Sequence, residues 1–301
     1  VGSEMCIRDR DRICDLSKTL AAAESTEEFM KDMVQFYKDF GVGKLGLHKA
    51  FRVGHDENDN VEIQPITRIA HVKLEDLVGY EIPKQKLIEN TEAFISGKEA
   101  NNVLLFGDAG TGKSSSVKAI LNEYYGQGLR MIEVYKHQFK ALSEVLEQIK
   151  DRNYKFIIYM DDLSFEEFEI EYKYLKAVIE GGLEKKPDNI LIYATSNRRH
   201  LVRERAGDKL EVGADDDIHS SDTVQEKLSL VYRFGVRIYF GAPDRKEFHT
   251  IVKTLAARHG IQMPEDQLLL EAGKWEISHG GLTGRTAQQF IDHLLGKEES
   301  K

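Results

Sequence analysis

The residues best suited to chemistry stand together in one short stretch, residues 107–114, which reads GDAGTGKS. The spacing fits G-x-x-x-x-G-K-[ST], the pattern of a phosphate-binding loop, or P-loop. Glycines let such a backbone curl so that several N–H groups face a phosphate, and the helix that follows presents its positive end. In this pattern Lys113 reaches the outer phosphates and Ser114 holds Mg²⁺. The predicted phosphate-binding residues are Gly107, Asp108, Ala109, Gly110, Thr111, Gly112, Lys113, Ser114 and Ser115.

A second group of polar side chains follows an apolar run. The segment KFIIYM at residues 155–160 predicts a buried strand that ends at Asp161 and Asp162. Because the carboxyl ends of parallel strands line the ligand crevice, we expect both acids beside the P-loop. Asp161 would hold Mg²⁺, and Asp162 would orient or deprotonate an attacking water, although many such enzymes carry the longer Glu there. The alternative is an acid that only caps the next helix, but Ser164 and Glu167 already form that capping box.

A third polar group ends another apolar run. Residues 190–195, ILIYAT, predict a buried strand whose tip carries Ser196 and Asn197. An amide beside the outermost phosphate could position a water nucleophile. Asn197 is therefore a candidate catalytic residue together with Lys113 and Asp162.

The elements around these groups alternate between strand and helix. Residues 102–106, NVLLF, predict a strand before the P-loop, and apolar residues recur at helical spacing after it. Further strands are expected at 130–135 and 236–240. This alternation predicts an α/β fold with a parallel sheet. A plain glycine-rich turn, the alternative to a P-loop, does not require such flanks.

The chain divides into four parts that differ in residue pattern. Residues 1–10 resemble translated read-through of a sequencing adapter and are set aside, so the true amino terminus and any upstream domain stay open. Residues 11–72 predict a helix, which opens with a capping box at Ser25 and Glu28, followed by strands. Residues 73–242 form the predicted core. Residues 243–301 contain only helical patterns and predict a lid.

Two polar segments are expected to be solvent-exposed structure rather than binding sites. Residues 198–211 mix basic with acidic side chains, which favours a solvated face over a nucleic-acid contact. Residues 213–222 include three consecutive aspartates and are expected to form a loop rather than a metal site.

Composition limits the classes of function. The 301 residues are 41% hydrophobic and 31% charged, and no apolar run approaches the ~20 residues that span a bilayer. The net charge of −9 argues against a surface that is basic all over, so a nucleic-acid contact would need a local patch. Cys6 and Cys14 provide no disulfide framework and no zinc set. We therefore expect a soluble protein in a reducing, cytoplasmic location.

Taken in order, the P-loop, the acid pair, the strand-tip Asn, an Arg-Phe-Gly before the last strand and an arginine in a helical lid resemble the AAA+ ATPases. This resemblance implies a P-loop NTPase core with a five-stranded parallel sheet sandwiched by helices, in the order 5-1-4-3-2, and a C-terminal helical lid. It gives Asn197 the sensor 1 role and Arg285 the sensor 2 role of reading the γ-phosphate. Arg233 would be an arginine finger offered to a neighbouring subunit, and Val78 and Gly79 would lie against the adenine.

Five segments within about residues 70–296 resemble, more narrowly, the bacterial AAA+ family known as domain of unknown function 815. They are NNVLLFGDAGTGKSS, FIIYMDDLSFE, YATSNRRHL, EKLSLVYRFG and GLTGRTAQQFIDHL. The chain departs from related proteins at Val231 and Tyr232, where a polar pair is usual before the finger. It also lacks the aromatic-hydrophobic-Gly loop that threading AAA+ machines carry after the second strand, and Tyr135-Lys136-His137 is a poor substitute.

The sequence therefore predicts an ATPase that uses ATP and Mg²⁺ to change the conformation of a protein or nucleic-acid partner, as a homo-oligomer and without a membrane. A second hypothesis is a nucleotide-dependent switch or loader that hydrolyses ATP slowly, which the short Asp162 and the missing pore loop favour. A small-molecule kinase is disfavoured, because it has no use for the sensor Asn and the lid Arg.

Overall fold

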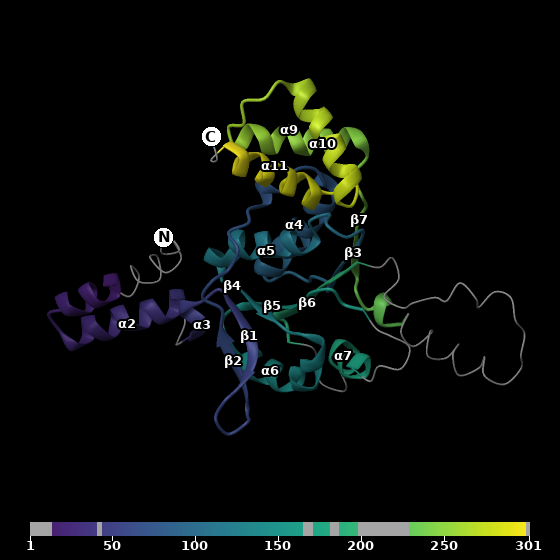
Figure 1. The fold of residues 1–301 in the computed structure, drawn as a ribbon. Coiled ribbons are helices and arrows are strands. Elements are labelled where there is room, and N and C mark those ends of the chain that lie inside the picture. Colours follow the sequence, from purple (N-terminus) through teal and green to yellow (C-terminus); the bar gives the residue numbers. More distant parts are fainter. Residues whose placement is uncertain (1–13, 41–43, 165–170, 181–186, 198–228, 299–301) are drawn as a thin grey trace, which may run out of the picture.

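The computed structural model describes residues 14–40, 44–164, 171–180, 187–197 and 229–298 (Figure 1). The predicted adapter-like start, the basic segment 198–211 and the loop 213–222 lie outside these ranges. The capping box of Ser164 with Glu167 also falls partly outside them.

The central feature is a seven-stranded sheet. All neighbouring strands run parallel except β1 and β2, which form an antiparallel hairpin. In spatial order the strands are β2 (Val61–Pro65), β1 (Ala50–His55), β4 (Leu129–Glu133), β5 (Lys155–Met160), β6 (Ile190–Ser196), β3 (Val103–Gly107) and β7 (Val236–Phe240).

The strand order of the core is confirmed. Counted along the chain from the P-loop strand, β7-β3-β6-β5-β4 is the predicted order 5-1-4-3-2. The sheet is longer than predicted because β1 pairs with β4 and carries β2 with it. Without them β4 would be an edge strand with unpaired backbone groups, so segment 11–72 extends the sheet and covers that edge.

Helices cover both faces of the sheet (Figure 1). On one face lie α4 (Glu81–Ile95) and α5 (Lys113–Tyr124), and on the other lie η3 (Lys136–Ala141), α6 (Leu142–Ile149) and α7 (Glu171–Glu180). Strand β5 illustrates the packing, since Phe156 and Ile158 belong to the cluster under α6 whereas Ile157 and Tyr159 belong to the cluster under α5. A strand buried on both faces reads as a continuous apolar run, which is why it was visible in the sequence.

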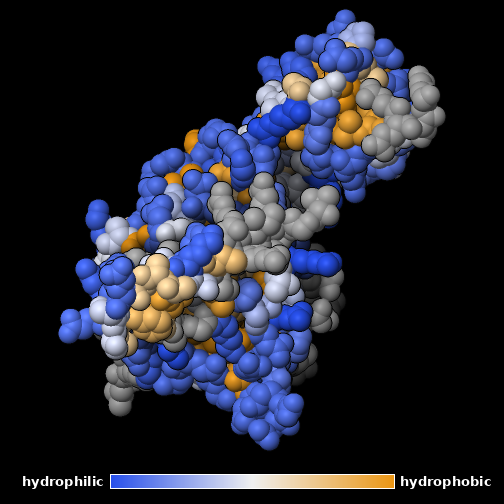
Figure 2. All heavy atoms as spheres, turned by 90° about the vertical axis from the view of Figure 1, so that its left-hand side faces the viewer, coloured by the Kyte–Doolittle hydropathy of each residue, from blue (hydrophilic) through white to orange (hydrophobic). Residues whose placement is uncertain are grey.

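The C-terminal lid is a bundle of three helices, α9 (Arg245–Arg258), α10 (Glu265–His279) and α11 (Gly284–Glu298). The helices enclose their own core, which includes Phe248, Ala272 and Ile291. A capping box starts α9, because the Glu247 N–H binds Asp244 Oδ1 at 2.8 Å and the Asp244 N–H binds Glu247 Oε2 at 2.9 Å. The lid stands out from the α/β body as a separate lobe (Figure 2).

The N-terminal helix α2 (Thr26–Phe40) precedes the short α3 (Lys44–Leu47). Its predicted capping box is present, since the Glu28 N–H binds Ser25 Oγ at 3.1 Å and the Glu24 N–H binds Glu28 Oε2 at 3.0 Å. Phe29 in its first turn is 41% exposed. In the described part of the chain, no helix is both long and apolar enough to cross a membrane.

Candidate nucleotide site

The P-loop occupies the turn between β3 and α5, as predicted. Gly107 has a φ of 135°, and a Cβ atom there would lie 2.1 Å from the Phe240 carbonyl oxygen on β7. The Asp108 N–H donates to that same carbonyl at 3.0 Å, and Asp108 Oδ2 accepts from the Ala242 N–H at 2.8 Å. The edge strand thus holds the start of the loop, and only glycine allows the two backbones to come so close.

Lys113 begins α5 with its side chain inside the loop, and the residue is only 4% exposed. Its ammonium donates to the carbonyl oxygens of Gly107 at 3.3 Å and Asp108 at 2.6 Å. Burial lowers the pKa of Lys113, and the carboxylates of Asp108, Asp162 and Asp161 oppose that shift. The positive charge is therefore positioned within the loop, where it faces three acids.

The acid Asp161 receives two hydroxyl groups on one oxygen. Ser114 Oγ donates to Asp161 Oδ1 at 2.7 Å, and Thr195 Oγ1 donates to the same atom at 2.6 Å. Burial by itself would raise the pKa of Asp161, but the side chains of Thr195, Ser114, Tyr159 and Lys118 together leave the pKa lowered. The structure therefore brings together the two residues predicted to hold Mg²⁺, with Asp161 favoured in its charged form.

Asp162 and Asn197 also meet. The Asn197 amide Nδ2 donates to Asp162 Oδ1 at 2.8 Å, and both side chains are exposed. Asp162 has a left-handed φ of 51°, and its backbone N–H donates to Thr195 Oγ1 at 3.0 Å. The predicted acid and amide thus lie side by side at the carboxyl edge of the sheet.

Thr195 is a site residue that the sequence reasoning did not assign. It is 2% exposed and joins Asp161 to the backbone of Asp162. The available signal was a hydroxyl at the end of an otherwise apolar strand, directly before the Ser-Asn pair. A buried hydroxyl needs a partner, and in this sheet the nearest polar groups are those that end β5.

The lid contacts the P-loop at the start of α11. The backbone N–H of Arg285 donates to the Gly110 carbonyl oxygen at 3.2 Å. A Cβ atom on Gly110 would lie 3.1 Å from Thr283 Oγ1 and 3.2 Å from Arg285 Cβ. The Arg285 guanidinium is exposed and contributes to the lowered pKa of Lys113. The arginine predicted from the lid therefore lies beside the loop.

The segment before α4 connects the lid to the core. Val78 packs against the lid cluster, and Gly79 has a φ of 81°. The Tyr80 hydroxyl donates to the Gly241 carbonyl oxygen at 3.0 Å, and burial raises the pKa of Tyr80 to about 12. The Lys84 ammonium donates to the Leu77 carbonyl oxygen at 2.7 Å. Residues 77–80 are thus fixed between the two parts, where the sequence placed the adenine.

An arginine of the lid also binds the backbone just before residues 77–80. Arg258 donates through Nη1 to the Asp76 carbonyl oxygen at 3.1 Å and through Nη2 to the Glu75 carbonyl oxygen at 2.5 Å. Neither Arg258 nor Lys84 was singled out from the sequence, because these three hydrogen bonds end on backbone oxygens that carry no sequence signal.

Arg233 occupies a different place from the other predicted site residues. It lies on the turn before β7, the edge strand of the sheet, and its side chain is exposed. Its backbone N–H donates to the Leu230 carbonyl oxygen at 3.1 Å. The arginine-finger role of Arg233 stays a prediction.

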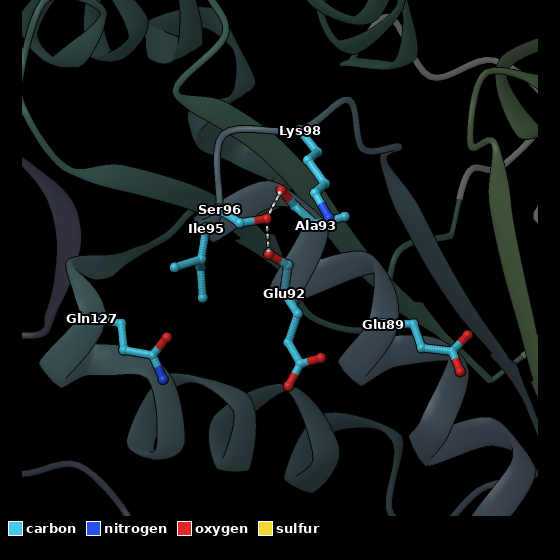
Figure 3. Close-up of a pocket in the computed structure, with 7 residues that line it drawn as sticks. All are labelled: Glu89, Glu92, Ala93, Ile95, Ser96, Lys98 and Gln127. Atoms are coloured by element: carbon cyan, nitrogen blue, oxygen red, sulfur yellow. Dashed lines mark hydrogen bonds between the residues drawn. The ribbon is translucent and has the colours of Figure 1, made fainter.

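A hollow of about 660 Å³ lies elsewhere, between the end of α4 and Gln127 (Figure 3). Its Glu92 side chain already accepts the Tyr124 hydroxyl at 2.8 Å. Ser96 at its rim donates to the carbonyl oxygens of Glu92 and Ala93. None of the predicted site residues lines this hollow.

The family model described as "Protein of unknown function (DUF815)" matches residues 47–298. The chain belongs to this family. The match begins just before β1, so it includes the hairpin that extends the sheet. With its strand order, P-loop and helical lid, the chain also has the AAA+ fold that its motifs resemble.

Other likenesses are more distant. The replication factor C large subunit of Staphylothermus marinus is 34% identical over 74 residues, which cover 24% of this chain and 17% of that protein. A mutant structure of Thermotoga maritima RuvB aligns at 18% identity with a TM-score of 0.48, covering 73% of this chain and 64% of RuvB. The structure described as the RuvB Holliday junction branch migration motor aligns at 14% identity with a TM-score of 0.41, covering 74% and 72%.

We predict that Gly107→Ala disrupts the loop. The added methyl would meet the Phe240 carbonyl oxygen, so the free energy of unfolding should fall by at least about 1–3 kcal/mol. Denaturant unfolding measures this change. Gly126→Ala is the matched control, because a Cβ there has no neighbour within 4 Å. Equal stability of the two variants would contradict the close approach of β3 and β7.

Proposed function

We propose that this chain is a Mg²⁺-dependent AAA+ ATPase that hydrolyses ATP to ADP and phosphate. The observation that carries the proposal is the 2.7 Å hydrogen bond between the Ser114 hydroxyl and Asp161. It joins the residue after the P-loop lysine, on α5, to the carboxylate that directly follows β5. Sequence motifs alone could not establish that these two groups meet.

The donor set suits Mg²⁺. A serine hydroxyl and a carboxylate are hard oxygen ligands, and Mg²⁺ in nucleotide sites typically takes one or two carboxylates plus phosphate oxygens. Among the described residues no group of three or more His, Cys, Asp or Glu could hold a metal ion. Ser114 and Asp161 would hold Mg²⁺, which when bound would supply positive charge against the phosphates.

The chain's own groups supply the remaining functions. Lys113 offers its charge to the outer phosphates from within the loop. Asp162 accepts the proton of the attacking water or orients it, and Asn197 holds that carboxylate by the 2.8 Å hydrogen bond. Arg285 reaches the γ-phosphate from the lid. Val78 and Gly79 border the adenine.

A slow switch or loader is the second candidate. The observation that favours it is that Asp162 is one methylene shorter than Glu and already binds Asn197. Steady-state turnover distinguishes the two, because a switch keeps turnover near zero with every partner. In either case we propose a homo-oligomer that acts on a protein or nucleic-acid client in the cytoplasm.

We predict that Lys113→Ala abolishes ATP hydrolysis and greatly weakens ATP binding, because the phosphates lose the buried cation of the loop. Phosphate release and calorimetry measure the two effects. Lys86→Ala, an exposed lysine on α4, is the control and should behave as wild type. Unchanged turnover in Lys113→Ala would refute the P-loop assignment.

Substitutions of Asp161 and Asp162 should differ in how ATP hydrolysis depends on the Mg²⁺ concentration. Asp161→Asn is expected to raise the Mg²⁺ concentration needed for half-maximal activity, because Asp161 faces Ser114. Asp162→Asn is expected to keep Mg²⁺-ATP binding while hydrolysis falls, because Asp162 faces Asn197. Titration of Mg²⁺ tests both. Identical metal profiles with equal loss of hydrolysis would show that this division of roles is wrong.

Arg233 should act in trans. An arginine supplied by a neighbour contributes on the order of 10³ or more to phosphoryl transfer, so turnover per subunit should rise with protein concentration. Arg233→Ala should bind ATP but be inactive alone, and mixing it with Lys113→Ala should restore part of the activity. Arg237→Ala, also exposed near this edge, should stay active. If sizing shows co-assembly and no mixing ratio restores turnover, Arg233 does not serve a neighbouring subunit.

A further inference from the structure

Thr195 binds each of the three residues that follow β5. Its hydroxyl donates to Asp161 Oδ1 at 2.6 Å and accepts the Asp162 N–H at 3.0 Å. Its backbone oxygen accepts the Leu163 N–H at 2.6 Å. One residue on β6 therefore determines the path of the chain through both acids.

These contacts continue the sheet where its regular pairing stops. The register between β5 and β6 ends with Met160 opposite Ala194. Beyond it, Asp162 adopts a left-handed φ of 51°, which is unfavourable for a residue with a Cβ atom. The Thr195 hydroxyl binds the N–H of Asp162 and so helps hold this conformation.

The Thr195 hydroxyl is both a hydrogen-bond donor and a hydrogen-bond acceptor. Its single proton goes to Asp161, and its lone pair accepts from the backbone of Asp162. A residue without the hydroxyl would leave Asp161 without one of its donors and the Asp162 N–H without its acceptor. Both hydroxyls that reach Asp161 bind the same oxygen, Oδ1.

We propose that Thr195 is a positioning residue whose hydroxyl sets the metal-binding carboxylate of Asp161 and the water-orienting carboxylate of Asp162 at the same time. The proposal rests on the proposed function, because it assigns Thr195 to the same site. Thr195 itself would contact neither the nucleotide nor the metal.

The test compares Thr195→Ser with Thr195→Ala, which differ by one oxygen, and adds Thr195→Val as the isostere. The first readout is binding of Mn²⁺ in the presence of ADP, followed by electron paramagnetic resonance, and the second is kcat for ATP. Loss of an outer partner of a ligand typically costs 10–100-fold in metal affinity or activity. We expect losses of about this size in the Ala and Val variants, near wild-type behaviour in the Ser variant, and unchanged affinity for ATP without metal in all three.

Thr91 supplies the control. It is also fully buried, and its hydroxyl bonds the Leu87 carbonyl oxygen at 2.7 Å and the Tyr193 hydroxyl at 2.8 Å, away from the acids. Thr91→Ala should therefore lower stability without changing Mn²⁺ affinity. If it lowers Mn²⁺ affinity as much as Thr195→Ala does, the effect is general and the proposal fails.

The remaining outcomes of the experiment also test the role of Thr195. Wild-type Mn²⁺ affinity and kcat in Thr195→Ala would overturn the positioning role while leaving the ATPase assignment intact. If the Ala and Val variants do not fold, a folded Ser variant that has lost Mn²⁺ affinity would overturn it equally. A wild-type protein that neither binds Mn²⁺ with ADP nor hydrolyses ATP would instead remove the proposed function, and this inference with it.

Discussion

The site depends on one carboxylate oxygen. Asp161 Oδ1 accepts one hydroxyl from the start of α5 and another from the end of β6, so three separate elements meet at a single atom. Hydrogen bonds donated to a carboxylate favour its charged form. Here one donor follows the P-loop lysine and the other lies at the end of β6, and the lowered pKa of Asp161 reflects them.

The sheet topology makes that meeting possible. Strand β6 lies between β3 and β5, so the P-loop and the acid pair rise from the two strands that flank Thr195 and Asn197. Parallel pairing points all three carboxyl ends to one edge. Strand β1 of the β1–β2 hairpin pairs with β4, and the hairpin completes the sheet on that side.

The sequence predicts the elements that have a local residue pattern and the loop that requires glycine. Buried strands such as residues 155–160 read as apolar runs, and the P-loop and the Ser25–Glu28 box have fixed spacings. The β1–β2 extension was not predicted as part of the core, because pairing with β4 depends on contacts distant in sequence. Thr195 was missed for a similar reason, since a threonine in a strand is ordinary until its partners after β5 are known.

Burial divides the site into two halves. Lys113, Thr111 and Thr195 are almost fully buried and are fixed by hydrogen bonds within the chain. Asp162, Asn197, Arg285 and Arg233 are exposed. In the proposed reaction, the first group holds the phosphates and positions the metal ligand, and the second orients water and stabilises the transferring charge. Preorganised groups need little rearrangement to bind nucleotide. In the proposed mechanism one chain therefore binds nucleotide by itself, and the rate of hydrolysis depends on how the lid and a neighbouring subunit place the exposed side chains.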